Sequence, residues 1–196
     1  MAGFLTSRLL WLATGSLWRG SALVRSNYRG RQIPTAVGLI LALSILVVEA
    51  GRILAAAGGV GGTWIAAGSR PVVLLAAVGF GFLGLIDDLV GNGDDRGFRG
   101  HLAALARGRV TTGLIKLFGG AAVALVVVAS VSSRPSARLV ADAALVALTA
   151  NLGNLFDRAP GRVVKVSVLW FGVVVVAAAF AGQTSLMVAP AVVMGA

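Results

Sequence analysis

Long apolar runs without charged residues divide the chain and predict helices that cross a membrane. Such a helix needs about 20 predominantly apolar residues. The clearest runs are residues 32–48, 71–86, 110–133, 139–156 and 166–196, with Lys116 the only charge in the third and Asp142 the only charge in the fourth. The last run exceeds the length of one span, so we expect a turn at Gly182, Gln183 and Thr184 to divide it.

Two further apolar segments lie at 4–18 and 53–69. The first is short and contains Arg8, but with Trp11 and Trp18 we expect it to form a first span. The second has adjacent glycines at 58–59 and 61–62, which favour a loop because glycine weakens a helix interior. The pattern predicts an all-α fold, a polytopic bundle of about six to seven transmembrane helices. We expect residues 1–196 to form a single integral membrane domain that is incomplete at its carboxyl end.

Composition supports a membrane protein. Hydrophobic residues make up 58% of the chain and charged residues 12%, about half the usual share of a soluble protein. So few polar residues cannot cover the surface of a soluble domain, which excludes a soluble enzyme and a disordered tail. The absence of cysteine excludes a disulfide framework.

The net charge is +10, from 17 basic and 7 acidic residues. In a soluble chain this excess would suggest nucleic acid, but here the basic residues lie between apolar runs and indicate membrane orientation, so no nucleic-acid partner is expected. Eleven basic residues lie in the loops on one side of the spans, and four lie in the loops on the other side. The eleven are Arg19, Arg25, Arg29, Arg31, Arg96, Arg99, Arg107, Arg109, Arg158, Arg162 and Lys165. The four are Arg52, Arg70, Arg134 and Arg138. The positive-inside rule predicts that the first side is cytoplasmic, in a plasma membrane or cell inner membrane.

Five of the seven acidic residues fall on this basic side: Asp87, Asp88, Asp94, Asp95 and Asp157. Carboxylates at helix ends beside many arginines suggest a site for a divalent metal and phosphate. For the pair Asp87 and Asp88, the alternative is that both simply end the third span in water. Asp94 and Asp95 lie in a glycine-rich loop and are expected to be solvated.

Asn151, Asn154 and Asp157 are spaced three residues apart. On an α-helix this spacing places them on one broad face over about 9 Å, where they are suited to bind a nucleotide or a metal. The alternative is interhelical hydrogen bonding by the asparagines. Lys116 lies one turn inside its span and is expected to face a polar cavity or pair with an acid, unless it extends to the membrane surface.

Arg31 precedes Pro34 and Thr35, which are expected to open the second span. Arginines here are suited to bind phosphate, or they only carry the orientation signal. His101 begins a short amphipathic stretch that predicts an interfacial helix, and a role as catalytic base is the weaker interpretation.

Four motifs occur in the order of a known family: Pro34-Thr35-x-x-Gly38, Gly84-Leu85-Ile86-Asp87-Asp88, Thr111-Thr112-Gly113-Leu114-Ile115-Lys116 and Asn151-x-x-Asn154-x-x-Asp157. With them, residues 28–165 resemble the polyprenyl-phosphate N-acetylhexosamine-1-phosphate transferases. The family includes phospho-N-acetylmuramoyl-pentapeptide transferase of peptidoglycan synthesis.

The resemblance implies a ten-helix enzyme with a cytoplasmic active site. It implies Mg²⁺-dependent transfer of a phospho-N-acetylhexosamine from a UDP-sugar to a polyprenyl phosphate, releasing UMP. It implies catalytic roles for Asp87, Asp88 and Lys116, with Asp88 also in the lipid-phosphate or metal site. Asp157 resembles the family's metal ligand, and Asn151 and Asn154 its nucleotide-side amides, while Arg31 stands where a substrate-side lysine is common.

Departures from the family pattern leave other interpretations open. The second aspartate expected after Asp157 is missing, and the family's histidine-containing loop would lie beyond residue 196, so the activity of this chain by itself is uncertain. A catalytically inactive membrane scaffold or small transporter is one alternative, and an intramembrane prenyltransferase is another. The sequence does not fix the oligomeric state, and a homodimer is one candidate.

Overall fold

The structure is a computed structural model of the whole chain. It describes residues 1–20, 23–27, 29–60, 70–90, 97–132, 135–157, 160–183, 190 and 194. The predicted positions Tyr28, Gly61, Asp94, Asp95, Arg96, Arg134, Arg158 and Thr184 lie outside the described residues.

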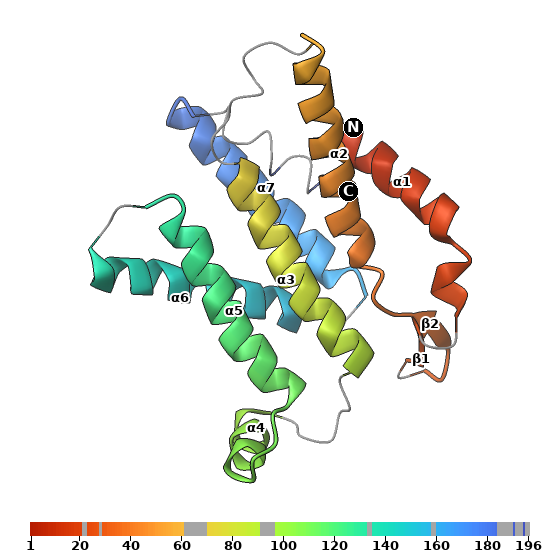
Figure 1. Cartoon of the computed structure of the whole chain (residues 1–196), viewed down its shortest axis with the longest axis vertical. Helices are drawn as coiled ribbons and strands as arrows, with labels where there is room; N and C mark the ends of the chain where they lie inside the picture. Colours follow the sequence, from red (N-terminus) through yellow and green to blue (C-terminus); the bar gives the residue numbers. More distant parts are fainter. Residues whose placement is uncertain are drawn as a thin grey trace.

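Five helices of the described residues are long and apolar enough to cross a membrane. At 1.5 Å per residue they measure roughly 27–32 Å, which matches a hydrocarbon core of about 30 Å. They are α2 (Leu39–Ala57), α3 (Arg70–Val90), α5 (Thr112–Ala129), α6 (Ser136–Phe156) and α7 (Arg162–Phe180). The predicted all-α membrane bundle is confirmed (Figure 1).

The shorter elements lie outside this set. Helix α1 (Ala2–Thr14) is followed by a single 3-10 turn, η1 (Leu17–Arg19), and α4 (Gly97–Ala106) lies below the end of α5 in Figure 1. With 13 residues α1 is only about 20 Å long, so it is too short to cross the membrane as a first span. Gly182, with φ 67°, forms the turn expected after α7.

The second apolar run folds differently from the prediction. Residues Gln32–Pro34 form a strand, so Pro34 does not open the helix, which begins at Leu39. At its other end the helix continues to Ala57, beyond the charges that were expected to end it. Glu49 and Arg52 neutralise each other there, with 2.8 Å between Oε2 and Nη2, and both side chains are largely buried.

The strand belongs to a small hairpin that hydrophobic patterning did not predict. Strands β1 (Val24–Ser26) and β2 (Gln32–Pro34) pair antiparallel, with Arg25 opposite Ile33. Asn27 holds the turn, because its side-chain oxygen accepts hydrogen bonds from the backbone N–H groups of Arg29 and Arg31. Gly30 supplies the left-handed conformation that the turn requires, with φ 71°.

The membrane-spanning helices pack through small residues. Helix α3 lies against α5, and α5 against α6 (Figure 1). Gly79 of α3 faces Val123 of α5, and Gly119 of α5 faces Leu83 of α3, so closely that a Cβ atom on either glycine would overlap the opposite side chain. Small residues allow this approach because no side chain separates the two backbones.

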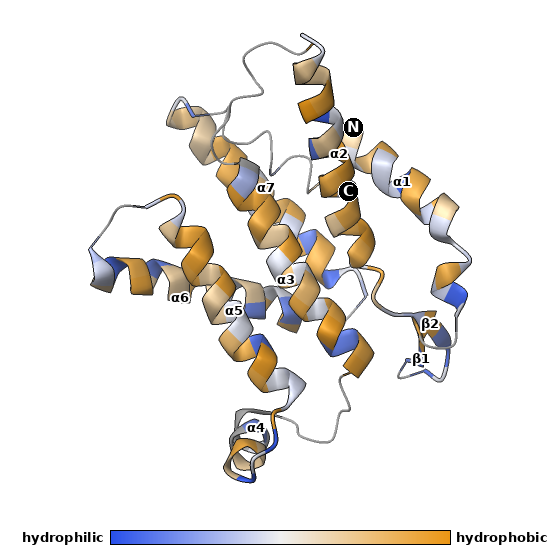
Figure 2. Cartoon of the chain, in the orientation of Figure 1, coloured by the Kyte–Doolittle hydropathy of each residue, from blue (hydrophilic) through white to orange (hydrophobic). Residues whose placement is uncertain are grey.

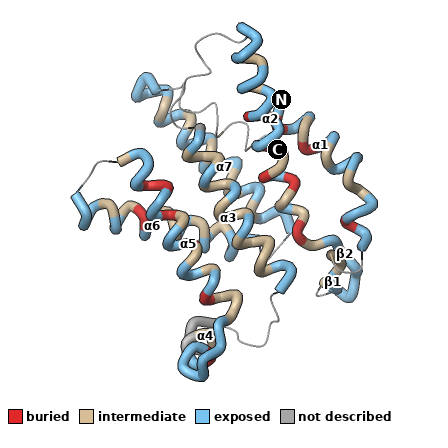
Figure 3. Tube along the Cα trace, in the orientation of Figure 1, coloured by how far each residue is buried: buried red, intermediate tan, exposed pale blue. Residues whose placement is uncertain are grey.

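Large apolar side chains remain exposed along the helices. Figure 3 shows long pale blue stretches of exposed residues on them. Leu169 and Trp170 of α7 are 68% and 61% exposed. Apolar exposure on this scale is unfavourable in water and suits contact with lipid. The chain is therefore a multi-pass membrane protein.

Candidate functional site

Polar residues gather where α3 and α5 end, among otherwise apolar turns. Figure 2 shows hydrophilic residues near the lower ends of both helices. Asp87 and Asp88 lie in the last turn of α3, and Lys116 lies in the second turn of α5. Because α3 descends to this end and α5 rises from it, residues 29 positions apart in the chain face each other here.

Lys116 pairs with Asp87. Its Nζ atom donates a hydrogen bond to Asp87 Oδ2 at 2.6 Å, and the two side chains are 29% and 34% exposed. The lysine therefore does not simply extend to the membrane surface, since its charge is matched by a neighbouring helix. An ammonium carries three N–H groups, and this contact uses one of them.

Asp88 contacts a different part of the chain. Its Oδ2 atom accepts a hydrogen bond from the backbone N–H of Ala36 at 3.1 Å, joining α3 to the segment that precedes α2. Ala36 is 4% exposed and has φ 59°, the left-handed region that residues with a Cβ rarely adopt. The backbone of Thr35 is held as well, because its N–H donates to Leu23 O at 2.7 Å.

The two adjacent aspartates thus point to different partners. Consecutive residues on an α-helix lie about 100° apart around its axis, so Asp87 faces α5 while Asp88 faces the start of α2. Both carboxylates have partners in the fold, and they do more than end α3 in water. The sequence did not predict the Ala36 contact. Every residue except proline has a backbone N–H, so no residue type marks the one that meets Asp88.

The hairpin also contacts this end of α3. The Arg25 guanidinium donates to the carbonyl of Leu89 at 3.4 Å, one of the last carbonyls of the helix. A cation at a helix C-terminus is favourable because the exposed carbonyls carry partial negative charge. This contact holds the hairpin beside the end of α3 that carries the aspartates.

Asp157 ends α6 as its C-terminal cap and is exposed. It lies at the negative end of the helix dipole, so a cation at this position would relieve an unfavourable electrostatic arrangement. Within the described residues it makes no side-chain hydrogen bond or ion pair.

The remaining predicted residues are not drawn into this cluster. Asn151 and Asn154 lie exposed on α6, and Arg31 lies exposed just before β2. In the part of the chain that the structure describes, none of the three side chains makes a hydrogen bond with Asp87, Asp88 or Lys116.

A protein-only metal cage is absent from the described residues, where no three acidic or histidine side chains converge. Mg²⁺ needs fewer protein ligands than this, because it is usually held by one or two carboxylates together with substrate phosphates and water. The side chain of Asp157 and the second oxygen of Asp88 offer carboxylate oxygens of the kind that Mg²⁺ prefers as ligands.

His101 contacts the first residues of α5. Its Nδ1 atom lies 2.9 Å from the hydroxyl of Thr111, and its ring lies against Gly113. The Thr111 hydroxyl also accepts from Leu114 N at 3.3 Å as the N-cap of α5. His101 therefore fixes the start of the helix that carries Lys116, and α4 is the helix predicted around it.

Comparison of the chain with protein-family models, with curated proteins and with solved structures finds no match.

Proposed function

We propose that the protein transfers a phospho-N-acetylhexosamine from a UDP-sugar to a polyprenyl phosphate on the cytoplasmic side of the membrane. The observation that carries the proposal is the contact between Lys116 and Asp87 beside Asp88. It provides a positive group next to carboxylates at the end of a span, where a lipid phosphate and a soluble nucleotide can meet.

The reaction exchanges one pyrophosphate bond for another. An oxygen of the lipid phosphate attacks the phosphorus attached to the sugar, a new P–O–P bond forms, and the bond to the uridine phosphate breaks. UMP leaves with the bonding electron pair on its phosphate oxygen. The step needs stabilisation of negative charge on the transferred phosphoryl group more than it needs covalent chemistry from the protein.

The side chains have distinct roles in this proposal. Lys116 donates its two remaining N–H groups to phosphate oxygens, held in place by Asp87. Asp88, anchored by the Ala36 N–H, keeps its second oxygen for the metal, and the lipid phosphate attacks in its ionised form. Arg31, Asn151 and Asn154 are proposed to contact the substrates rather than the reacting atoms.

Asp157 and Asp88 would hold Mg²⁺ together with the phosphates of the UDP-sugar. When bound, the metal neutralises phosphate charge as a Lewis acid. The carboxylate of Asp157 serves this purpose at the end of α6, where its charge is otherwise unfavourable.

The test is exchange of radiolabelled UMP into UDP-N-acetylglucosamine by membranes that carry the protein, with polyprenyl phosphate and Mg²⁺ added. Asp157→Asn should abolish exchange, because the amide keeps the shape but loses the charge that attracts the metal. Asp142→Asn is the matched control, since it makes the same change at the opposite end of α6 and should leave exchange unchanged.

A second pair of variants tests the cation. Lys116→Arg should lower exchange by at least about tenfold, because a planar guanidinium does not replace a compact ammonium. Lys165→Arg, the same change at the chain's other lysine, should have no effect. Full exchange by Asp157→Asn would remove the metal assignment, and no exchange with any nucleotide sugar tried would favour the scaffold.

A further inference from the structure

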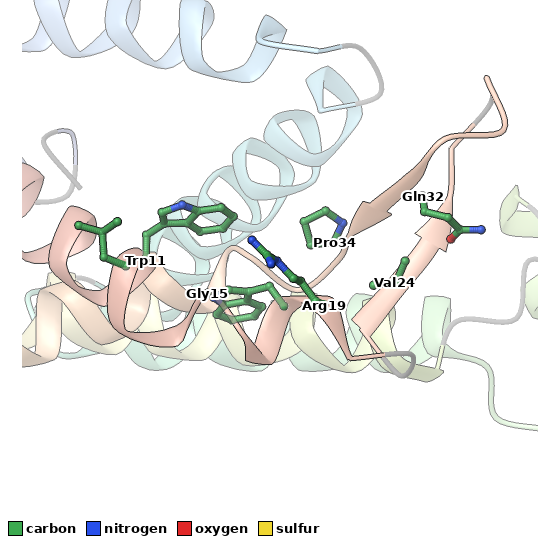
Figure 4. A pocket seen from close by; sticks show the side chains of 8 residues that line it. Trp11, Gly15, Arg19, Val24, Gln32 and Pro34 are labelled. Atoms are coloured by element: carbon green, nitrogen blue, oxygen red, sulfur yellow. The ribbon is translucent and has the colours of Figure 1, made fainter.

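A cavity lies between α1, η1 and the β1–β2 hairpin, away from the aspartates. Its volume is about 550 Å³, and its walls include Trp11, Trp18, Arg19 and Pro34. Figure 4 shows the Arg19 guanidinium between the side chains of Trp11 and Pro34. The proposed transfer reaction uses none of these four residues.

One wall of the cavity is fixed and apolar. Trp18 is 5% exposed, and its indole N–H donates to the hydroxyl of Thr14 at 2.9 Å. That hydroxyl donates in turn to the carbonyl of Leu10 at 2.6 Å. Trp11 is 37% exposed and also lines the cavity.

Arg19 supplies the charge in this cavity. Its side chain is exposed and makes no hydrogen bond or ion pair with any residue that the structure describes. The first 48 residues contain five arginines and no acidic residue, so no carboxylate of this segment neutralises it. The five N–H groups of a guanidinium match the oxygens of a phosphate.

The surroundings of the cavity point to a lipid rather than a soluble anion. Helix α1 exposes large apolar side chains, with Leu9 at 67% and Leu12 at 68%, and Leu12 also lines the cavity. Tryptophan and arginine close to the end of such a helix are typical of the membrane–water interface.

We propose that this cavity binds the headgroup phosphate of an anionic membrane phospholipid, with Arg19 on the phosphate and Trp11 and Trp18 against the upper part of the chains. The site does not depend on the proposed transfer reaction, because it shares no residue with it. It would anchor the hairpin whose Arg25 contacts the end of α3.

The experiment measures quenching of tryptophan fluorescence by lipids with brominated acyl chains. The chain carries Trp64→Phe and Trp170→Phe, so that only Trp11 and Trp18 report, and it is reconstituted in phosphatidylcholine vesicles. Brominated phosphatidylglycerol should associate about fivefold more strongly than brominated phosphatidylcholine, the ratio expected for one arginine at an anionic surface.

Variants assign the preference to the cavity. Arg19→Gln should reduce the ratio to near one, whereas Arg19→Lys should keep most of it and shows that the fold tolerates a change there. Arg29→Gln removes a charge from the hairpin turn without altering the cavity walls, and should leave the ratio unchanged.

Several outcomes would overturn the proposal. These are equal quenching by the two lipids, an unchanged ratio in Arg19→Gln, and an equal loss in Arg29→Gln, which would indicate general surface charge. Relief of quenching by millimolar inorganic phosphate would instead assign the cavity to free phosphate. Displacement by polyprenyl phosphate at a lower mole fraction than by unlabelled phosphatidylglycerol would assign it to the reaction's acceptor.

Discussion

Removing either partner of the ion pair between Lys116 and Asp87 should destabilise the protein, and removing both should cost less than the sum. Lys116→Met keeps the length of the side chain without its charge, and Asp87→Asn keeps the shape without the charge. Each single variant leaves one charge without its partner at the end of a membrane span.

The geometry sets the size of the effect. At an effective dielectric constant of about 20, unit charges 2.6 Å apart attract by about 6 kcal/mol. Desolvation and the ordering of the two side chains offset most of this energy, and side chains about one third exposed are partly screened. We therefore expect a coupling energy of about 1–2 kcal/mol, between the values typical of exposed and buried pairs.

A double-mutant cycle measures this coupling directly. Unfolding is followed by circular dichroism as sodium dodecyl sulfate is added to dodecylmaltoside micelles. The control cycle combines Asp87→Asn with Lys165→Met, which removes the other lysine, at the start of α7. It should give a coupling near zero, because Lys165 makes no ion pair with Asp87.

A coupling below about 0.3 kcal/mol for Lys116, or one equal to that of Lys165, would refute the reasoning, since experimental additivity has about this precision. The charges would then be solvated independently despite their short distance. Lys116 would also lack the support that the proposed transfer reaction assigns to Asp87.

Three other predictions test the fold. Since the chain has no cysteine, Ser26→Cys and Ser136→Cys can each be introduced as the single labelling site in intact cells. If the hairpin is cytoplasmic, an impermeant reagent should label Ser136→Cys and not Ser26→Cys. Labelling of Ser26→Cys alone would show the opposite orientation. Gly79→Ala should destabilise the folded protein by about 1–3 kcal/mol, because its Cβ would lie 2.8 Å from a side-chain carbon of α5. Gly84→Ala is the control on the same helix. Its Cβ would enter open space, so this change should be neutral or mildly stabilising. Ala36→Gly should stabilise the protein by about 0.5 kcal/mol in the same unfolding assay. The change relieves about 1–2 kcal/mol of left-handed backbone strain, which exceeds the additional entropy loss of glycine, about 0.5–1 kcal/mol. A destabilised variant would argue against that strain.

Hydropathy predicted most of the helices because crossing a membrane is a local requirement on each segment. A run of about 20 apolar residues must form a helix in lipid, where unpaired backbone groups are unfavourable. The helices α3, α5, α6 and α7 therefore overlap the predicted runs closely, and the turn at Gly182 follows from the excess length of the last run. The same logic placed Asp87, Asp88 and Lys116 at one end of their spans.

The boundaries of α2 show where this logic fails. Its first residues were predicted from the apolar character of residues 32–38, but the turn at Asn27 and Gly30 pairs Gln32–Pro34 with an earlier strand. Its extension to Ala57 depends on the pairing of Glu49 with Arg52. A charge count treats these two residues as a break, although together they are neutral.

Only the tertiary structure decided which carboxylate serves which partner. Asp87 meets Lys116 across 29 positions of the chain, and Asp88 meets Ala36 across 52. Both contacts arise because α3 packs against α5 on one side and α2 on the other, while adjacent side chains diverge by about 100°. The sequence by itself determined that this is a polytopic helical membrane protein with acids and a lysine at the ends of its spans. The pairing of those groups depends on interhelical contacts, which no local pattern of hydrophobic residues encodes.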